Sequence, residues 1–351
     1  GRDGRPRAAG NRMRSVDWFY PSVLAGAWRT SVGTVLGKFD PAFLRSLEVG
    51  GGFPCKNKSL YFPFPKDCVL RENPAAALPV CPEPAGAGCT NLDKEYAPCL
   101  LPASVTEDFK PSAPPAFLSI SLLTEWLTAS SLPMPLPGDQ IQDAFPLDER
   151  VQVAIDPNTY TAEEAMLFIT AGLAFPPGWT MELRCAPDKQ YLSVQPMGGE
   201  RRLVFWRSAG TGANGWTCPV DLARPLRSAR TIRMTLATPA LFRDGWIPGW
   251  LRDGKPVPGS RDLKLKLAGA AVDRPRPISG WSLDQTSWGP KPSRRMAPAG
   301  SVYFCEVLDG DPSQLPDLWL EPVSDDAQDR LDGFGLALWG VWNQPPLEKS
   351  K

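Results

Sequence analysis

Histidine is absent from the 351 residues of this chain. Its absence excludes Ser-His-Asp and Cys-His triads, removes imidazole from any metal site and takes away the commonest general base at neutral pH. Acid–base chemistry would have to come from carboxylates, lysine, tyrosine or thiolate, and no pairing of these groups stands out. We therefore expect a binding protein with no cofactor, not an enzyme.

Net charge is also missing, because 38 basic residues balance 38 acidic ones. The chain as a whole therefore has no field that would draw it to nucleic acid or to an anionic membrane. No apolar run approaches the ~18 residues that indicate a membrane span. The opening residues, Gly1–Arg7, do not resemble a signal peptide. These features predict a cytoplasmic protein with no membrane partner.

Charge is nevertheless distributed unevenly along the chain. Residues 1–14, 201–233 and 274–295 hold five, seven and five cations, each against a single acid, whereas 306–332 hold nine acids against one arginine. A basic part of the surface could face RNA while the acidic part faces a basic partner subunit. The alternative is that these clusters are ordinary solvated surface.

The cysteines gather in one part of the chain, with five of the eight between residues 51 and 100. A secreted protein would pair them, but the length and the opening residues favour free thiols. Cys68, Cys81, Cys89 and Cys99 could supply four thiolates to a structural zinc, although none of their spacings is a CxxC. Free thiols, buried or at the surface, are the alternative.

Hydrophobic residues make up 42% of the chain, enough for sizeable cores, and the 40 prolines are spread out, which indicates many irregular connections. Apolar periodicity predicts helices over 21–36, 41–48 and 116–128. Beyond residue 150 the period changes to two, which predicts strands around 151–155, 166–175, 181–185, 190–196, 202–206, 232–236, 263–268, 301–307 and 334–342. The pattern indicates an α+β protein with two halves of similar makeup.

Four later stretches carry a more specific signal. They are Ala237–Pro248 (ATPALFRDGWIP), Pro275–Phe304 with its PRPISGWSL and PKPSRRMAPAGSVYF segments, Gly198–Arg202 (GGERR) and Asp332–Gly340 (DGFGLALWG). Together they resemble the RAMP-superfamily proteins that form subunit three of the type III-B CRISPR (Cmr) effector complex, which are Cas-five-like.

The resemblance extends upstream. Arg2–Pro6 and Pro21–Arg29 resemble the family's "RDGRPF" and "PPSTLAGALR" segments, and 61–67 and 149–156 match its middle. Residues 73–115 lie outside the resemblance and are rich in Pro, Ala and Gly. The family usually has a β-strand before the first segment, so we expect that strand to be missing, and Arg7 stands where an aromatic residue is usual.

The resemblance implies two tandem ferredoxin-like (RRM-like) domains with long loop insertions. Residues 1–220 would form the first domain, with a Pro/Cys-rich insertion at about 51–115, and residues 221–351 the second, with a glycine-rich loop. It further implies a non-catalytic subunit for antiviral defence that binds the 5′ handle of the CRISPR RNA. The protein partners implied are the large polymerase-type subunit and the neighbouring backbone RAMP subunits.

The candidate RNA-binding residues follow from these motifs. They are Arg2, Arg5, Arg12, Arg14, Ser22, Gly26, Arg29, Lys291, Arg294, Arg295, Gly333, Phe334 and Gly335.

Each group of candidates has a competing interpretation. The glycines would let backbone amides approach a phosphate or base, or they would merely permit a tight entry into the last strand. The residues of 22–29 would hold an anion at a helix N-terminus, or serve as a cap and a surface arginine. The remaining arginines would grip phosphates, or be ordinary surface charge. Trp246 or Trp250 could stack on a base, although most tryptophans should lie in the core.

Two other functions stay open. A metal-independent CRISPR RNA-processing endoribonuclease would share the fold, so clean cuts in repeat RNA would indicate that activity. A Trp- and Pro-rich extracellular module, for example one that binds carbohydrate, would instead be indicated by disulfides.

Overall fold

The structure of the chain, a computed structural model, describes residues 16–72, 76–83, 96–106, 108–128, 133–187, 194–198, 202–282 and 288–342. Its helices are α1 (Pro21–Leu36), α2 (Pro41–Ser46), α3 (Ile120–Thr128), α4 (Val220–Leu226), α5 (Gly249–Arg252), α6 (Ala327–Leu331) and the 3-10 helix Pro312–Leu318.

The strands of the first part of the chain are β1 (Val49–Lys56), β2 (Ser59–Pro63), β3 (Cys68–Arg71), β4 (Ala76–Pro79), β5 (Cys81–Pro82), β6 (Cys99–Leu100), β7 (Phe117–Ser119), β8 (Ile141–Gln142), β9 (Leu147–Ile155), β10 (Ala162–Leu173), β11 (Trp179–Cys185), β12 (Val194–Pro196) and β13 (Leu203–Phe205). Those of the second part are β14 (Thr231–Leu236), β15 (Lys264–Ala271), β16 (Arg276–Ile278), β17 (Trp281–Ser282), β18 (Gly289–Pro290), β19 (Arg294–Met296), β20 (Val302–Asp309) and β21 (Ala337–Val341). Strands β9 to β15, β20 and β21 confirm the period-two prediction in the described residues, whereas it did not include β1 to β8 or β16 to β19.

The predicted helices have clear local causes. The helix over 21–36 is confirmed as α1, which begins with Pro21 in its first turn and ends at Gly37, in the left-handed conformation that glycine adopts readily. The helix at 41–48 stops at Ser46, and the Asp40 side chain caps its start by accepting the amides of Ala42 and Phe43. The prediction over 116–128 is partly wrong, because β7 occupies residues 117–119 before α3 begins.

The first sheet has the strand order β11-β1-β2-β7-β8. Strand β1 runs antiparallel to β11, with a bulge between Gly51 and Phe53. Gly51 and Gly52 have φ values of 98° and 82°. A Cβ atom on them would lie 2.5 Å from Trp216 and 2.2 Å from Leu24, so this bulge requires glycine on both grounds.

The second sheet has the order β15-β20-β14-β21, and each neighbouring pair is antiparallel. Along its central strand β14, Ile232, Met234 and Leu236 alternate with Arg233 and Thr235, and all five are buried. Because successive side chains point to opposite faces, both faces of this sheet must be covered.

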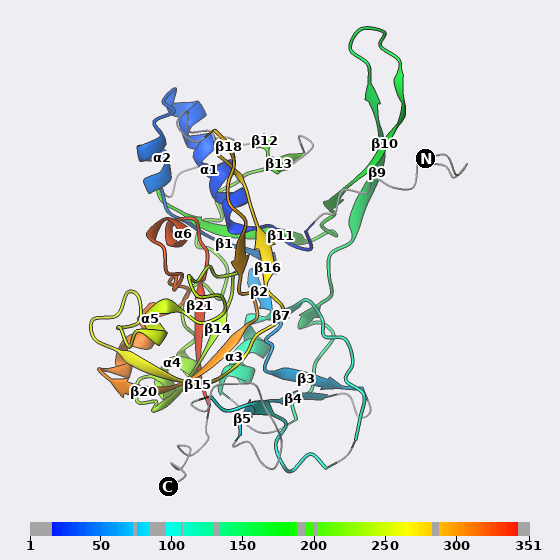
Figure 1. Cartoon of the computed structure of the whole chain (residues 1–351). Coiled ribbons are helices and arrows are strands. Elements are labelled where there is room, and N and C mark those ends of the chain that lie inside the picture. Colours follow the sequence, from blue (N-terminus) through cyan, green and yellow to red (C-terminus); the bar gives the residue numbers. More distant parts are fainter. Residues whose placement is uncertain are drawn as a thin grey trace.

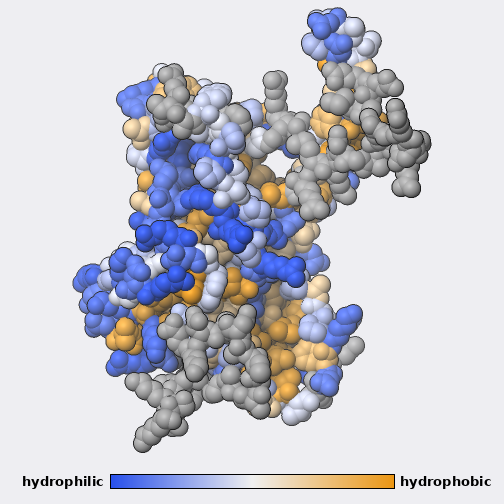
Figure 2. Space-filling view, viewed as in Figure 1, coloured by the Kyte–Doolittle hydropathy of each residue, from blue (hydrophilic) through white to orange (hydrophobic). Residues whose placement is uncertain are grey.

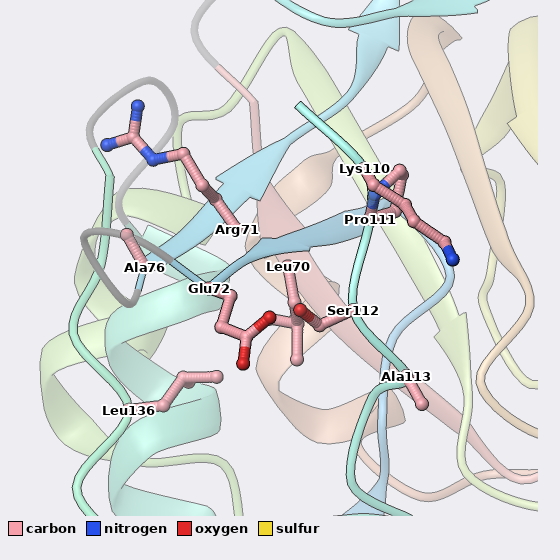
Figure 3. A pocket seen from close by; sticks show the side chains of 9 residues that line it. All are labelled: Leu70, Arg71, Glu72, Ala76, Lys110, Pro111, Ser112, Ala113 and Leu136. Carbon is pink, nitrogen blue, oxygen red and sulfur yellow. The ribbon is translucent and has the colours of Figure 1, made fainter. Parts of the chain in front are cut away.

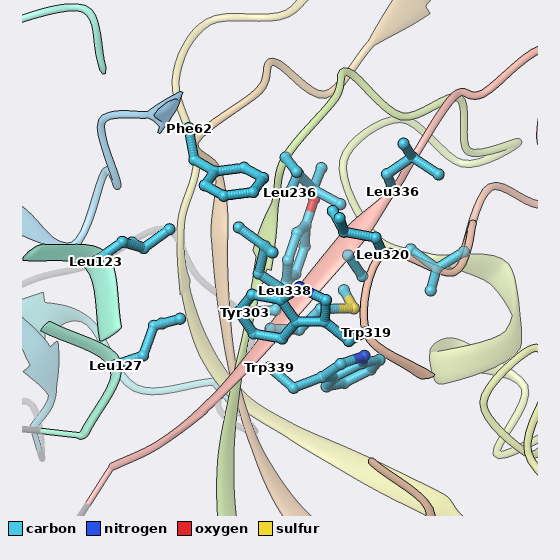
Figure 4. Packing of buried hydrophobic residues seen from close by; sticks show 14 of the residues in the cluster. Phe62, Leu123, Leu127, Leu236, Tyr303, Trp319, Leu320, Leu336, Leu338 and Trp339 are labelled. Carbon is cyan, nitrogen blue, oxygen red and sulfur yellow. The ribbon is translucent and has the colours of Figure 1, made fainter. Parts of the chain in front are cut away.

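One face of the second sheet packs against the first half of the chain. Phe62, Leu123 and Leu127 lie in the same buried cluster as residues of β14 and β21, and Figure 4 shows them around Trp339. The two halves therefore share a core. The predicted boundary at residue 220 stays a prediction.

The other face is covered by the predicted Pro/Cys-rich insertion, residues 51–115. Its first residues belong to the core strands β1 and β2. The segment that follows reaches the second sheet, where Asp67 pairs with Arg233 at 2.9 Å and the Ala97 amide donates to Ala268 O. The described part of the insertion therefore acts as a cover for β14 and β15.

Strands β9 and β10 pair into a long two-stranded arm that projects from the body (Figure 1). Among the described residues, no helix has both the length and the apolar character needed to cross a membrane. The predicted mixture of helices and antiparallel sheets is confirmed. These strands do not establish two tandem ferredoxin-like domains. The first sheet has five strands, in the order β11-β1-β2-β7-β8, and the four-stranded second sheet has a different arrangement.

Candidate functional site

A pocket of about 620 Å³ lies where three segments that are distant in sequence meet. The loop 241–245 forms one wall, residues 293–295 at β19 form a second, and the acidic residues of 325–329 form the third. Figure 2 shows hydrophilic side chains gathered in a band across the middle of this face. Two of the motifs singled out in the sequence, and the acidic stretch before the last one, therefore meet at one site.

Asp325 fixes the loop wall of the pocket. Its carboxylate accepts the backbone amides of Arg243 and Gly249, both at 2.9 Å, and its side chain is only 3% exposed. A Cβ on Gly249 would lie 2.8 Å from this carboxylate, so the close approach depends on glycine. Arg330 fixes the backbone at Asp325 by donating to the carbonyls of Ser324 and Asp325.

Asp329 fixes the opposite wall through Arg294. The guanidinium donates two parallel hydrogen bonds to the carboxylate, at 2.7 and 2.8 Å. Hydrogen bonding and charge from Asp329 raise the pKa of Arg294 above its usual value. Asp329 is 6% exposed and Arg294 is 51% exposed, so the arginine is anchored at one edge and still reaches solvent.

Two further arginines line the pocket with their charged groups in solvent. The Arg243 side chain is 71% exposed and its Nε lies 3.9 Å from Asp325, beyond hydrogen-bonding distance. Arg295, the neighbour of Arg294 on β19, is exposed as well. The Arg243 guanidinium can therefore donate to an anion in the pocket, and Arg295 adds positive charge at its solvent edge.

The pocket rests on an apolar floor. Phe334 is 1% exposed and belongs to a buried cluster with Leu241, Ile278 and Met296. These residues come from the loop wall, β16 and β19. Phe334 therefore supports the site from below, and its ring does not face a ligand.

The glycines beside Phe334 have a packing role. The amides of Gly333, Phe334 and Gly335 donate to the carbonyls of Arg330, Asp329 and Pro239 respectively, at 2.8 to 3.0 Å. A Cβ on Gly333 would lie 2.5 Å from Val49 O, and one on Gly335 would lie 2.6 Å from Ser324 Oγ. Since these amides already have acceptors within the protein, the geometry favours the alternative of a tight entry into β21.

Arg29 also has an internal role. Its guanidinium donates to Asp332 Oδ1 at 2.5 Å and to the carbonyls of Arg45, Leu47 and Leu331, so it ties α1 to the end of α6. Its side chain is only 12% exposed. The expectation of a phosphate-binding or surface arginine here is therefore not supported by its contacts.

Ser22 and Gly26 lie on the exposed side of α1. A Cβ on Gly26 would meet nothing within 4 Å. Ser22 is not the cap, because Tyr20 holds that position without a side-chain hydrogen bond. Both residues stay candidates by position alone.

Lys291 lies on the ribbon formed by β16–β19 and β17–β18, which leads into the pocket. The ribbon pairs Ile278 with Arg294 and Ser282 with Gly289, and between these ladders the Lys291 amide donates to Gly280 O at 2.8 Å. The Lys291 side chain is exposed. The ribbon thus brings Lys291, Arg294 and Arg295 onto one element.

The remaining candidates do not join the site. Arg2, Arg5, Arg12 and Arg14 lie outside the described residues, as does Cys89. Among the described residues, no group of three or more His, Cys, Asp or Glu side chains could hold a metal ion.

The other zinc candidates, Cys68, Cys81 and Cys99, are free thiols. Burial raises the pKa of Cys81 to about 11 and that of Cys99 to about 12, and raises that of Cys68 further. Because Cys89 lies outside the described residues, the four-thiolate zinc site stays a prediction beside the free-thiol alternative.

The two tryptophans proposed for stacking are packed inside the protein. Trp250 is 6% exposed and donates its indole N–H to Val323 O at 3.0 Å. Trp246 lies nearly parallel to Tyr303, with a ring-centroid distance of 6.5 Å. The general expectation of core tryptophans is confirmed for Trp250, and Trp246 is partly buried against the core.

Sequence reasoning did not select Arg243, although it lies inside the quoted ATPALFRDGWIP motif. For the acids of 306–332 it offered a partner subunit or solvated surface, whereas Asp325, Asp329 and Asp332 each hold an internal donor. The cluster of arginines near 294 was the sequence feature that could have indicated internal partners for these acids.

A second hollow, of about 530 Å³, lies in the insertion and is lined by residues that include Leu70, Glu72 and Leu136. Figure 3 shows the Glu72 carboxylate directed into it, while the charged ends of Arg71 and Lys110 point away. The hollow thus presents a carboxylate at its centre, and the arginine-lined pocket is the better candidate for a polyanion.

The fold and the pocket define a mixed α/β protein with an arginine-lined surface site, an arrangement typical of proteins that bind polyanions. More particularly, the chain belongs to the CRISPR-associated protein (Cas_Cmr3) family, whose family model matches residues 1–342. No curated protein sequence matches it.

Solved structures that match this chain include a chain of "Cryo-EM structure of the Type III-B Cmr-beta bound to cognate target RNA". The identity is 14%, over 93% of this chain and 86% of that chain, with a TM-score of 0.45. The same complex "bound to cognate target RNA and AMPPnP, state 1" also matches at 14% identity, over 93% of this chain and 89% of that chain, with a TM-score of 0.45.

Proposed function

We propose that this chain is a non-catalytic RNA-binding subunit of a type III-B Cmr complex and that it anchors the 5′ repeat-derived handle of the CRISPR RNA. Membership of the Cas_Cmr3 family supports the assignment to this system. The observation that carries the RNA-binding role is the convergence of Arg243, Arg294 and Arg295 on one pocket.

The four aspartates that line the pocket are each engaged by a donor of the protein. Asp244 pairs with Arg252 at 3.1 Å, Asp325 accepts two amides, Asp326 accepts the Gln328 amide and Asp329 holds Arg294. Arg252 and Arg294 thus balance the charges of Asp244 and Asp329, whereas the amides hold Asp325 and Asp326 in place and leave their charges. Arg243 and Arg295 are left to supply positive charge to an RNA phosphate.

The pocket is also held in shape before any ligand arrives. Bidentate and amide hydrogen bonds fix both walls, and Phe334 fills the floor. A site of this kind loses less conformational entropy on binding than one made of mobile loops. This supports a role in placing one segment of RNA in a defined position.

The proposal extends to the fold and to the protein partners. The sequence β14, α5, β15, β20, α6, β21, with the sheet order β15-β20-β14-β21, supports a ferredoxin-like unit in the second half. We also propose that the subunit docks to the large polymerase-type subunit and to neighbouring backbone RAMP subunits in the cytoplasm.

Fluorescence anisotropy with a labelled single-stranded RNA tests the function. The RNA carries a repeat-derived 5′ handle, a scrambled RNA serves as the reference, and binding is measured over a salt series with and without the polymerase-type subunit. We expect a preference for the handle, stronger with the partner, and intact RNA afterwards.

Variants Arg243→Gln and Arg295→Gln should each weaken RNA binding. Each should also reduce the salt slope, the steepness with which the logarithm of the binding constant falls with the logarithm of the salt concentration, by about 0.7, the value for one phosphate contact on a single strand. Arg261→Gln is the matched control, since Arg261 is an exposed arginine outside the pocket. Equal and weak binding of both RNAs would overturn the anchoring role. Cleavage of the repeat RNA by the purified protein would overturn the non-catalytic assignment.

A further inference from the structure

Trp288 is unusual among the tryptophans of this protein because its side chain is 66% exposed. Of the other tryptophans whose side chains the structure describes, seven are buried and four are partly buried. Leaving so large an apolar surface in water is unfavourable, and tryptophan is enriched where proteins bind partners. Trp288 therefore requires an explanation outside the core.

The position of Trp288 points to the kind of partner. It directly precedes β18 and is carried by the same ribbon as Lys291, Arg294 and Arg295. Residues 288–296 hold three cations and no acid. An exposed aromatic ring beside cations is the arrangement that binds single-stranded nucleic acid, because bases stack on the ring while the cations contact the phosphates.

The ribbon is ordered by its own hydrogen bonds. The β16–β19 and β17–β18 ladders are joined by the Lys291 amide, which donates to Gly280 O, and by Ser279 Oγ, which donates to Lys291 O, both at 2.8 Å. Residues 288 and 295 are seven positions apart, about 23 Å along a fully extended strand. Trp288 and Arg295 would therefore contact different nucleotides of one RNA strand.

We infer that Trp288 is a base-stacking site that binds one unpaired nucleobase of the RNA strand whose phosphates occupy the arginine-lined pocket. This inference rests on the proposed function and adds a second point of contact to it. Stacking tolerates every base, since each has a π-face, so the site fixes the path of the strand and leaves its sequence unread.

Binding of two RNAs by Trp288→Ala and Trp288→Phe tests the inference. One RNA carries the handle with its bases. The other has the same length and the same sugar–phosphate backbone but lacks the bases of the handle. For the base-bearing RNA, Trp288→Ala should bind about tenfold more weakly than the natural protein, and Trp288→Phe should retain most of the affinity. Neither variant should change the salt slope or the binding of the abasic RNA.

The control is Phe205→Ala, which removes a 71% exposed aromatic ring from β13, outside the ribbon. Natural affinity of Trp288→Ala for the base-bearing RNA, together with weakened binding by Arg295→Gln, would overturn the stacking site and leave the proposed function standing. An equal loss for both RNAs would also overturn stacking. If neither Trp288→Ala nor Arg295→Gln changes binding, both proposals fail.

Discussion

Two arginine–carboxylate pairs in this protein have similar geometry and opposite surroundings. Arg233 and Asp67 lie 2.9 Å apart where the insertion meets the second sheet, and each side chain is 1% exposed. Arg294 and Asp329 lie 2.7 Å apart at the pocket, where the arginine is 51% exposed. The first pair joins two parts of the fold, whereas the second leaves a cation at the surface.

The difference shows how burial changes the role of one chemical pairing. Asp67 also accepts the Trp126 indole N–H at 2.9 Å, so its carboxylate oxygens are both used inside the protein. A buried charge without its partner is strongly destabilising, whereas a solvated one is not. The buried pair should therefore matter for folding and the surface pair for binding.

The largest effect is expected from breaking the buried pair. Asp67→Ala leaves the Arg233 charge buried and removes the acceptor of Trp126, so the free energy of unfolding should fall by about 3–5 kcal/mol. Urea unfolding followed by tryptophan fluorescence measures it. The double variant Asp67→Leu with Arg233→Met removes both charges and should recover much of the loss. If the single and double variants lose equal stability, the unpaired charge is not the cause.

A second variant tests whether the glycines of 333–335 serve folding, like the buried pair, or RNA binding, like the surface pair. Gly333 has a φ of 87° and its Cβ position lies 2.5 Å from Val49 O, so Gly333→Ala should lower the free energy of unfolding by about 1–3 kcal/mol. Gly254→Ala is the matched control, because Gly254 has a φ of 64° and open space at its Cβ. RNA binding by folded Gly333→Ala should match that of the natural protein. Weaker RNA binding without a loss of stability would restore the loop to the binding surface.

The sequence was a good guide where a local pattern decides the structure. The 3.6-residue period between Pro21 and Leu36 predicted α1 to the residue, and alternation along 232–236 predicted β14. Both depend on forces within one segment, namely a proline start, a glycine stop and a buried strand face. The convergence of the motifs near 241 and 294 on one pocket was not predicted, because it depends on the tertiary fold.

The sequence was a poor guide where the partner of a side chain is far along the chain. Arg29 and Asp332 are 303 positions apart, and Arg233 and Asp67 are 166 apart. Nothing local distinguishes these arginines from Arg295, which faces solvent. The glycines of 333–335 were equally ambiguous, because an amide that meets a phosphate and one that meets a carbonyl require the same residue.

The smallest effect is expected at the surface pair, and its sign is informative. Asp329→Asn removes the negative charge that compensates Arg294 and weakens the bidentate hydrogen bonds. Because the arginine is half exposed, the loss in the free energy of unfolding should stay below about 1 kcal/mol.

Arg294 stays protonated near neutral pH with or without this carboxylate, since a guanidinium pKa lies above ~12. RNA affinity should therefore rise a few-fold, and the salt slope should steepen by about 0.7. Anisotropy over a salt series measures both, with Asp326→Asn as the control that removes a neighbouring acid not bonded to Arg294. An unchanged slope in Asp329→Asn would mean that Arg294 holds the wall of the pocket and does not contact RNA.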